Sequence, residues 1–378
     1  MCEGLSSLIR DAEDRGTISG TRICRGAPAI SLLLFVDDCF HFFRADESEA
    51  QVMKDILVTY ETASGQAISL PKSEIFCSRN VSDPLRTNLA SILGVQVVLR
   101  TDKYMGLPSM IGRNRNSTFA FIKDRVWQKI NSWSSKCLSI AGREVMIKSV
   151  LQAIPSYVMS IFQLPAALIN TIEKMINSFW WGHEHTNQRG INWLSWEKLS
   201  MHKTNGGMGF KDHTAFNLAM LGKQGWKFLT EPDSLVSRLF KARYFPNNTY
   251  LTANISHNPS YVWRSIMRAR FIVRGGARWS IGTGISIPIL EEPWVLNGES
   301  IATDIIGAHY VHHATIDNLM FPNEKRWNEV VVRHVLSADL ADKIMCMPLV
   351  AHVQSDRLIW KAEKNGKYFV KSAYRLCV

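Results

Sequence analysis

Two adjacent aspartates, Asp37 and Asp38, stand at the centre of the apolar stretch LLLFVDDCFHFF, which runs from Leu32 to Phe43. Such a pair is common in a solvated hairpin turn, because aspartate is a favoured turn residue. Here, however, apolar and aromatic residues flank the pair on both sides, which predicts strands buried on both faces and a turn close to a packed core. Two carboxylates held there would repel each other and lose hydration unless a cation lay between them.

A divalent metal ion would relieve that repulsion. Mg²⁺ binds a few carboxylate oxygens and leaves positions for water and phosphate. Pairs of such ions, about 3.5–4 Å apart, serve polymerases and nucleases. The stretch therefore allows two interpretations, a solvated turn or a site for Mg²⁺ (or Mn²⁺), and its apolar flanks favour the metal site.

The surrounding residues predict the elements that position this turn. Apolar periodicity indicates a helix over 5–16, and a second helix over 46–63 that Gly65 ends. The aspartates fall in a hairpin turn between two predicted strands, and Ser82 is the expected N-cap of a third helix. The predicted strands cover 17–24, 29–36, 39–45, 67–70 and 74–78.

From about residue 115 the period of the apolar residues is that of helices. A glycine-rich turn or strand, NGGMGF, separates the first group of helices from two more. The end of the chain reads as strand, EKNGK turn, strand and helix, because an Asn-Gly pair between alternating apolar residues is typical of a hairpin. We therefore expect an α+β protein in three parts, residues 1–112, 113–250 and 251–378.

The overall composition is that of a folded, basic protein. Of its 378 residues 46% are apolar and 20% charged, and Lys and Arg exceed Asp and Glu by 11. This excess favours a polyanionic partner, nucleic acid before membrane. No apolar run is long enough to predict a membrane-spanning helix, and no signal peptide is recognisable, so the protein is expected inside the cell, the nucleus included. The cysteines include no CxxC pair and are expected to be reduced thiols.

Basic residues gather in two stretches that predict nucleic-acid contacts. Between residues 100 and 150 they recur along helices whose other face is apolar, with Phe119, Ile122, Val126, Trp127 and Ile130. The second stretch, YVWRSIMRARFIVRGGARW, holds five arginines and no acidic residue. A solvated helix face is the alternative interpretation, but the clustering favours binding to a phosphate backbone. The candidate residues are Arg113, Arg115, Lys123, Arg125, Lys129, Lys136, Arg143, Lys148, Arg264 and Arg268.

The order of motifs along the chain resembles the plant branch of the LINE-type, non-LTR retrotransposon reverse transcriptases. FVDD resembles the F-A-D-D of their catalytic hairpin, and ASGQAISLPKS resembles a segment that follows it. KYMGLPSMIG, FWWG, NGGMGFKD and ARYFP continue the match, and LIWKAEKNGKYFVKSAYRL resembles the approach to their zinc-binding domain. The resemblance implies a partial reverse-transcriptase palm, a helical thumb-like domain, and a mixed C-terminal module that leads to a truncated zinc-binding domain.

By this resemblance the activity is RNA-directed DNA polymerisation, with an RNA template, a DNA primer and Mg²⁺ (or Mn²⁺). Asp37 would be a metal ligand of the palm, and Asp38 its more weakly coordinating neighbour. Lys72 would lie near the incoming nucleotide as a general acid for the leaving pyrophosphate, where an ammonium beside a triphosphate is chemically reasonable. The alternative for Lys72 is a loop lysine without a catalytic role.

The sequence also departs from the family pattern. Val36 and Cys39 stand where the family has alanine and serine, and His41 stands where an apolar residue is common. A third catalytic aspartate is expected on a strand well upstream of Asp37, and no match to that strand is present. The sequence therefore predicts an incomplete, inactive palm fragment. The alternative is a non-catalytic, retroelement-derived protein that binds nucleic acid.

Overall fold

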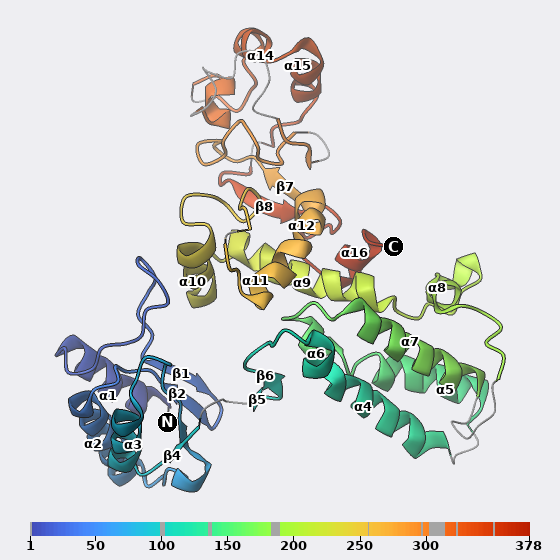
Figure 1. Cartoon of the computed structure of the whole chain (residues 1–378). Coiled ribbons are helices and arrows are strands. Elements are labelled where there is room, and N and C mark those ends of the chain that lie inside the picture. Colours follow the sequence, from blue (N-terminus) through green and yellow to red (C-terminus); the bar gives the residue numbers. More distant parts are fainter. Residues whose placement is uncertain are drawn as a thin grey trace. The chain divides into compact units, whose positions relative to one another are not determined.

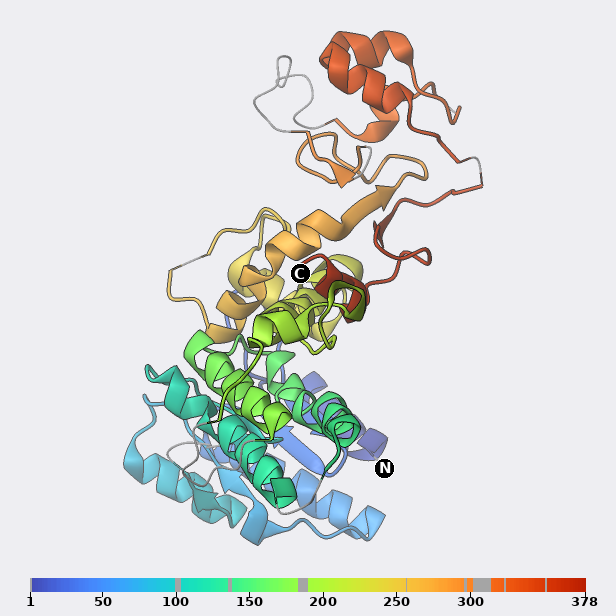
Figure 2. The ribbon, with the colours of Figure 1, turned by 90° about the vertical axis from the view of Figure 1, so that its right-hand side faces the viewer.

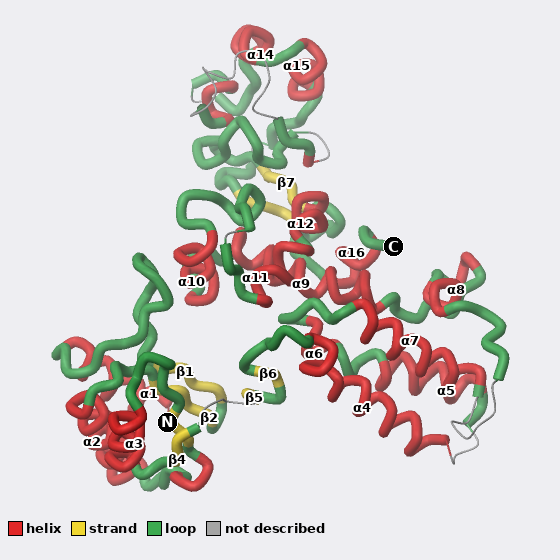
Figure 3. Tube along the Cα trace, in the orientation of Figure 1, coloured by secondary structure: helices red, strands yellow, loops and turns green. Residues whose placement is uncertain are grey.

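The computed structural model describes residues 2–98, 103–134, 138–182, 190–255, 257–295, 298–301, 314–322, 324–350 and 352–378 (Figure 1). They form two compact units. Unit 1 comprises Met1–Ile111 and Asp233–Pro246, and unit 2 comprises Gly112–Pro232 and Asn247–Val378. Helices dominate the described residues and the sheets are small and two-stranded (Figure 3). This confirms the predicted α+β class.

Unit 1 is built on helices whose ends the sequence marks. The longest, α2, follows Asp46, whose side chain accepts a hydrogen bond from the Ser48 amide (2.8 Å). It ends at Gly65, which adopts the left-handed conformation (φ 69°) that favours glycine. The predicted helix over 46–63 is therefore confirmed. The helices of unit 1 are α1 (Cys2–Asp14), α2 (Glu47–Ser64), α3 (Asp83–Leu93) and α10 (Leu235–Tyr244).

The main core of unit 1 lies between α1 and α2. Leu5 and Ile9 of α1 pack with Met53 and Ile56 of α2, at the helical spacing that the sequence shows. Leu32 and Leu34 pack against this cluster from the first strand. One face of that strand is thereby fixed to the helices.

The strands that the structure describes in unit 1 form three separate pairs. β1 (Leu32–Phe35) pairs antiparallel with β2 (Asp38–His41), and β3 (Glu74–Ile75) pairs parallel with β4 (Gln96–Val97). The third pair is β5 (Lys103–Tyr104) with β6 (Leu107–Pro108), which form the small hairpin of the KYMGLP motif.

Two of the predicted strands are wrong. In 17–24 only Thr21 makes a bridge, to Ile30. In place of a strand over 67–70 the chain forms a 3₁₀ turn, η1 (Leu70–Lys72). Pro71, directly after the predicted strand, lacks the amide proton that would extend a strand pairing, whereas it is tolerated at the start of η1.

Unit 2 is mainly helical, as predicted from residue 115 onward. Its helix α9 packs against α6, α7, α11, α12 and α16. The helices are α4 (Arg115–Ser134), α5 (Ile140–Met146), the π-helical η2 (Ile147–Leu151), α6 (Ser156–Met159), α7 (Ala166–Trp181), α8 (Trp196–Ser200), η3 (Lys203–Asn205), α9 (His213–Thr230), α11 (Tyr261–Arg268), α12 (Arg270–Gly276), η5 (Ile316–Leu319), α14 (Glu329–Val335), α15 (Ala338–Met345) and α16 (Val370–Arg375).

A buried amide ties α9 to the turn after α6. The Asn217 carboxamide oxygen accepts from the Leu164 amide (2.8 Å), and its nitrogen donates to the carbonyls of Met159 (2.8 Å) and Phe162 (2.9 Å). These bonds satisfy backbone groups that would otherwise be buried without partners.

Two glycines let aromatic rings approach the backbone in unit 2. A Cβ on Gly225 would lie 2.5 Å from the Tyr250 ring, and one on Gly276 would lie 2.0 Å from the Trp360 ring. Both rings are buried, and the Trp360 indole donates to the Ser372 hydroxyl (3.0 Å). The segment that ends the chain is thereby packed onto the helical core.

The final sheet corrects the predicted C-terminal hairpin. β8 (Arg357–Trp360) pairs antiparallel with β7 (Ala277–Ser280), far away in sequence, and not with a strand after Gly366. The EKNGK turn is present, since the Trp360 amide donates to the Gly366 carbonyl (2.8 Å), but the chain then leads into α16. Figure 2 shows β7 and β8 from the side, between the helices of unit 2 and the segments that hold α14 and α15. Within the described residues, no helix is long and apolar enough to cross a membrane.

Candidate metal-binding hairpin and basic surface

The two aspartates lie at the tip of the β1–β2 hairpin, as predicted. Phe35 pairs with Asp38, so Val36 and Asp37 form a two-residue turn. Val36 has a φ of 52°, a left-handed conformation that is unfavourable for a β-branched residue. The turn thus carries local backbone strain, a feature found at functional sites and in tight turns.

The expectation that both faces of the hairpin are buried is wrong. Phe35 is 53% exposed and Val36 74% exposed, and both aspartates are exposed. The reason is that the strand alternates: Leu32 and Leu34 face the core beneath, while Phe35 lies on the opposite face. That opposite face is covered only in part among the described residues, where the Phe40 ring packs against Tyr104 (4.3 Å between ring centres).

An exposed pair of carboxylates at a tight turn can hold a hydrated cation. Mg²⁺ keeps several waters and is often bound through one or two carboxylates together with substrate phosphates, and Asp37 and Asp38 match that chemistry. Among the residues that the structure describes, however, no cluster of three or more His, Cys, Asp or Glu side chains could enclose a metal ion. Among the described residues, the tip therefore offers two carboxylates as possible ligands and no enclosing third one.

Lys72 is the last residue of η1, and its side chain is exposed. It belongs to unit 1, as do both aspartates. No hydrogen bond or ion pair between these three described side chains joins Lys72 to the hairpin tip. Lys72 is therefore accessible to a ligand, but its position on the 3₁₀ turn does not identify which ligand.

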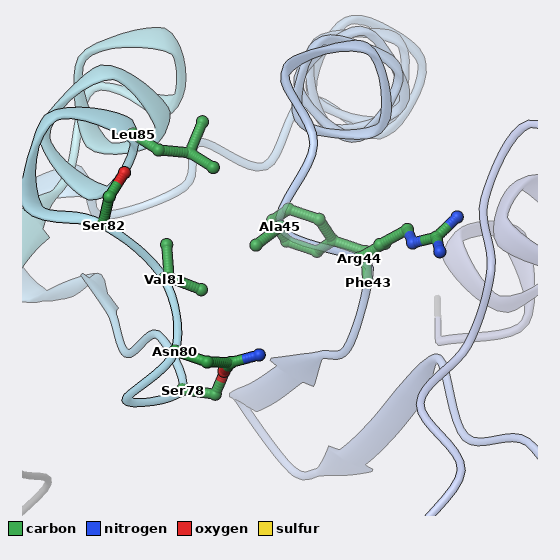
Figure 4. Close-up of a pocket in the computed structure, with 8 residues that line it drawn as sticks. All are labelled: Phe43, Arg44, Ala45, Ser78, Asn80, Val81, Ser82 and Leu85. Atoms are coloured by element: carbon green, nitrogen blue, oxygen red, sulfur yellow. The ribbon is translucent and has the colours of Figure 1, made fainter.

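A groove that the sequence did not indicate begins just after β2. It has a volume of about 520 Å³, and Figure 4 shows Phe43 and Ala45 facing Val81 and Leu85 across it. The Arg44 side chain points away from the groove. The lining is mixed, with polar groups as well as these apolar side chains, and nothing in it identifies a ligand. It comes from two segments that no local sequence pattern connects. The lining residues are Phe43, Arg44, Ala45, Ser78, Asn80, Val81, Ser82 and Leu85.

Helix α4 of unit 2 carries most of the first basic stretch. Phe119, Ile122, Val126 and Ile130 are buried, as predicted, while Trp127 is 48% exposed and therefore does not belong to that face. Trp127 follows Val126 by 100° around the helix, which takes its ring past the edge of the buried stripe. Lys136 lies outside the described residues.

Arg125 and Lys129 are exposed on α4 and line a second groove. Its volume is about 400 Å³, and Gln128, Ser132 and Ile154 complete its lining. Four of these residues belong to α4 and recur at helical spacing, so they form one continuous basic and polar face. Lys123 lies on another face of the helix, 3.6 Å from the Asp124 carboxylate.

Two predicted contact residues are engaged within the protein. Arg143 donates to the carbonyl of Trp180 (3.1 Å) at the end of α7. Lys148 pairs with Glu144 (2.7 Å), which also binds Lys203 (2.9 Å). Hydrogen bonds from these two lysines lower the pKa of Glu144. Arg143 and Lys148 thus bind groups of the protein itself, which makes them weaker candidates for contact with an external phosphate backbone.

The structure brings the two basic stretches together at Tyr261. The Arg115 guanidinium lies over the Tyr261 ring, 4.8 Å from its centre. Burial raises the pKa of Tyr261, and the positive charges of Arg115, Arg268 and Arg264 oppose that rise, so all three act on the same ring. Arg113 precedes α4 and is exposed. In the sequence these arginines belong to separate stretches, and nothing local connects residues 115 and 264.

Comparison with known proteins gives two relatives. No protein-family model matches the chain. An uncharacterized mitochondrial protein of Arabidopsis thaliana, AtMg00310, is 36% identical over 146 residues, which cover 38% of this chain and 94% of that protein. A ribonuclease H protein of the same plant, At1g65750, provisionally so named, is 27% identical over 277 residues, 71% of this chain. The matched part spans 44% of that second relative, less than half its length.

Proposed function

The chain belongs to the same family as the Arabidopsis mitochondrial protein, and on that premise we propose that it derives from a retroelement and carries the catalytic hairpin of an RNA-directed DNA polymerase. The observation that carries the proposal is the β1–β2 hairpin, whose tip exposes Asp37 in the turn and Asp38 at the start of β2. The ordered motifs around it, and the second relative's name as a ribonuclease H protein, support a nucleic-acid substrate.

In this proposal Asp37 and Asp38 hold Mg²⁺ or Mn²⁺ through their carboxylate oxygens. When bound, such an ion neutralises triphosphate charge and promotes deprotonation of the primer 3′ hydroxyl. Lys72 would donate a proton to the leaving pyrophosphate. Since the described residues offer no third ligand at the tip, the chain by itself is expected to bind metal weakly and to extend no primer.

Titration with Mn²⁺ tests the hairpin directly. Paramagnetic broadening of amide signals should begin at Asp37 and Asp38, and should be lost in Asp37→Asn. Asp14→Asn is the matched control, because it removes one exposed carboxylate from the same unit. Signals at the tip that stay unchanged at high Mn²⁺ would contradict the metal-binding role. Primer extension by the chain alone that is abolished by Asp37→Asn would refute the incomplete site.

A second candidate function is nucleic-acid binding without catalysis. It is favoured by the basic surface of unit 2, where Arg115, Arg264 and Arg268 are exposed and their charges converge on one tyrosine. This candidate predicts that strand binding is equal with Mg²⁺ and with a chelator, and that Asp37→Asn leaves it unchanged. A requirement for both Mg²⁺ and Asp37 in strand binding would favour the polymerase-type hairpin.

A further inference from the structure

The first residues of two helices of unit 2 are in contact. Arg115 is the first residue of α4 and Tyr261 is the first residue of α11, and the guanidinium lies 4.8 Å from the ring centre. Asn114 and Ser260 accept hydrogen bonds from the amides of Ser117 (3.1 Å) and Trp263 (3.2 Å). The positive ends of both helix dipoles therefore face the region that Arg115 occupies.

The charges at this junction are unfavourable for the free protein. Neither α4 nor α11 has an acidic residue in its first turn, where one would be stabilising. Instead Arg115 stands at the start of α4, while Arg264 and Arg268 follow one and two turns into α11. Among the described residues, none of these three arginines forms an ion pair. Positive charges that gather without a counter-charge in the protein attract anions from solution to this surface.

The Tyr261 ring is held in place by contacts with the core. It lies 6.2 Å from the rings of both Phe119 and Phe162, and its hydroxyl donates to the Gln163 carbonyl. The Gln163 amide in turn donates to the Ser265 hydroxyl (3.0 Å). Since Phe119 is fully buried, the place of Tyr261 is fixed by the core. Arg115 therefore lies over a ring that the core holds in place.

We infer that Arg115, Arg264 and Arg268 form one binding site for the phosphodiester backbone of a single nucleic-acid strand. Guanidinium groups bind phosphate oxygens in a bidentate manner. Three of them around one tyrosine offer more than one phosphate position, which suits a chain of phosphates better than a single isolated anion. This site rests on the proposed function. It goes beyond it in joining two segments that are far apart in sequence into one contact surface.

Fluorescence anisotropy with a labelled single-stranded oligonucleotide tests the site on the full chain. Replacing the three arginines together (Arg115→Gln, Arg264→Gln, Arg268→Gln) should weaken binding more than tenfold. It should also lower the slope of log affinity against log salt by about 2, since each phosphate contact on a single strand contributes about 0.7. The matched control is Lys364→Gln, Lys371→Gln, Arg375→Gln, which removes three exposed cations elsewhere in unit 2 and should leave the slope nearly unchanged.

The outcomes separate this inference from the proposed function. If the wild-type chain binds the strand and the triple arginine variant binds it equally, the site is refuted while nucleic-acid binding stands. If the wild-type chain binds no strand, the nucleic-acid proposal fails as well. Displacement of the strand by submillimolar inorganic phosphate or pyrophosphate would show a site for free phosphate and overturn the assignment. Melting curves that match the wild type show that the variants are folded.

Discussion

Replacing Val36 with glycine should stabilise the hairpin that carries the two aspartates. Val36 has a φ of 52° and is 74% exposed, so its side chain contributes strain but little burial. An L-residue in the left-handed conformation costs roughly 1–2 kcal/mol. Glycine avoids this cost, but it loses more conformational entropy on folding, which lowers the free energy of unfolding by about 0.5–1 kcal/mol. The net gain in the free energy of unfolding of unit 1 should therefore be about 0.5–1 kcal/mol.

The assay must report on unit 1 alone. All twelve tryptophans lie in unit 2, so tryptophan emission during urea unfolding follows unit 2 and should not change. Hydrogen exchange of the β1–β2 amides follows the hairpin and should slow by roughly two- to fivefold, because exchange through opening scales with the free energy of opening. The two probes together distinguish a local gain from a global effect.

Val58→Gly provides the matched control. Val58 is 51% exposed in α2, where its backbone is helical. The same substitution there should destabilise unit 1 by about 0.5 kcal/mol, because glycine is a poorer helix former than valine. Opposite signs for the two variants are the expected result. If Val36→Gly speeds exchange as Val58→Gly does, the backbone strain at the tip is refuted.

Two further predictions concern unit 2. Gly276→Ala would place a Cβ 2.0 Å from the buried Trp360 ring, so it should lower the free energy of unfolding by about 3 kcal/mol or more, measured by tryptophan emission in urea. Asp356 accepts hydrogen bonds from the amides of Gly282 (2.7 Å) and Gly284 (2.9 Å). Burial alone would raise the pKa of Asp356, but bonds from Gly284, Ser286 and Gly282 lower it. Because the folded pKa lies below the unfolded value, this stabilisation is present at neutral pH and is lost as the pH falls below about 4 through the folded pKa. In Asp356→Asn the melting temperature should therefore depend less on pH in this acidic range. A pH dependence equal to that of the wild type would refute the contribution of Asp356.

The sequence by itself determined the elements whose signals are local. The apolar period and the flanking Asp46 and Gly65 predicted α2 within one residue, because caps and helical faces depend only on near neighbours. The hairpin at Asp37 was likewise predicted, since alternation and a turn suffice for it. The polymerase activity and the magnesium site remain predictions.

Tertiary structure decided what depends on residues far apart in the chain. β8 pairs with β7 because Trp360 fits against Gly276, a contact that no pattern around the EKNGK turn could indicate. The outer face of the hairpin is exposed because the helices of unit 1 cover only one side of it. Arg115 meets Tyr261 because the core fixes the starts of two helices together. Local sequence sets which elements form, whereas long-range packing sets which side chains meet.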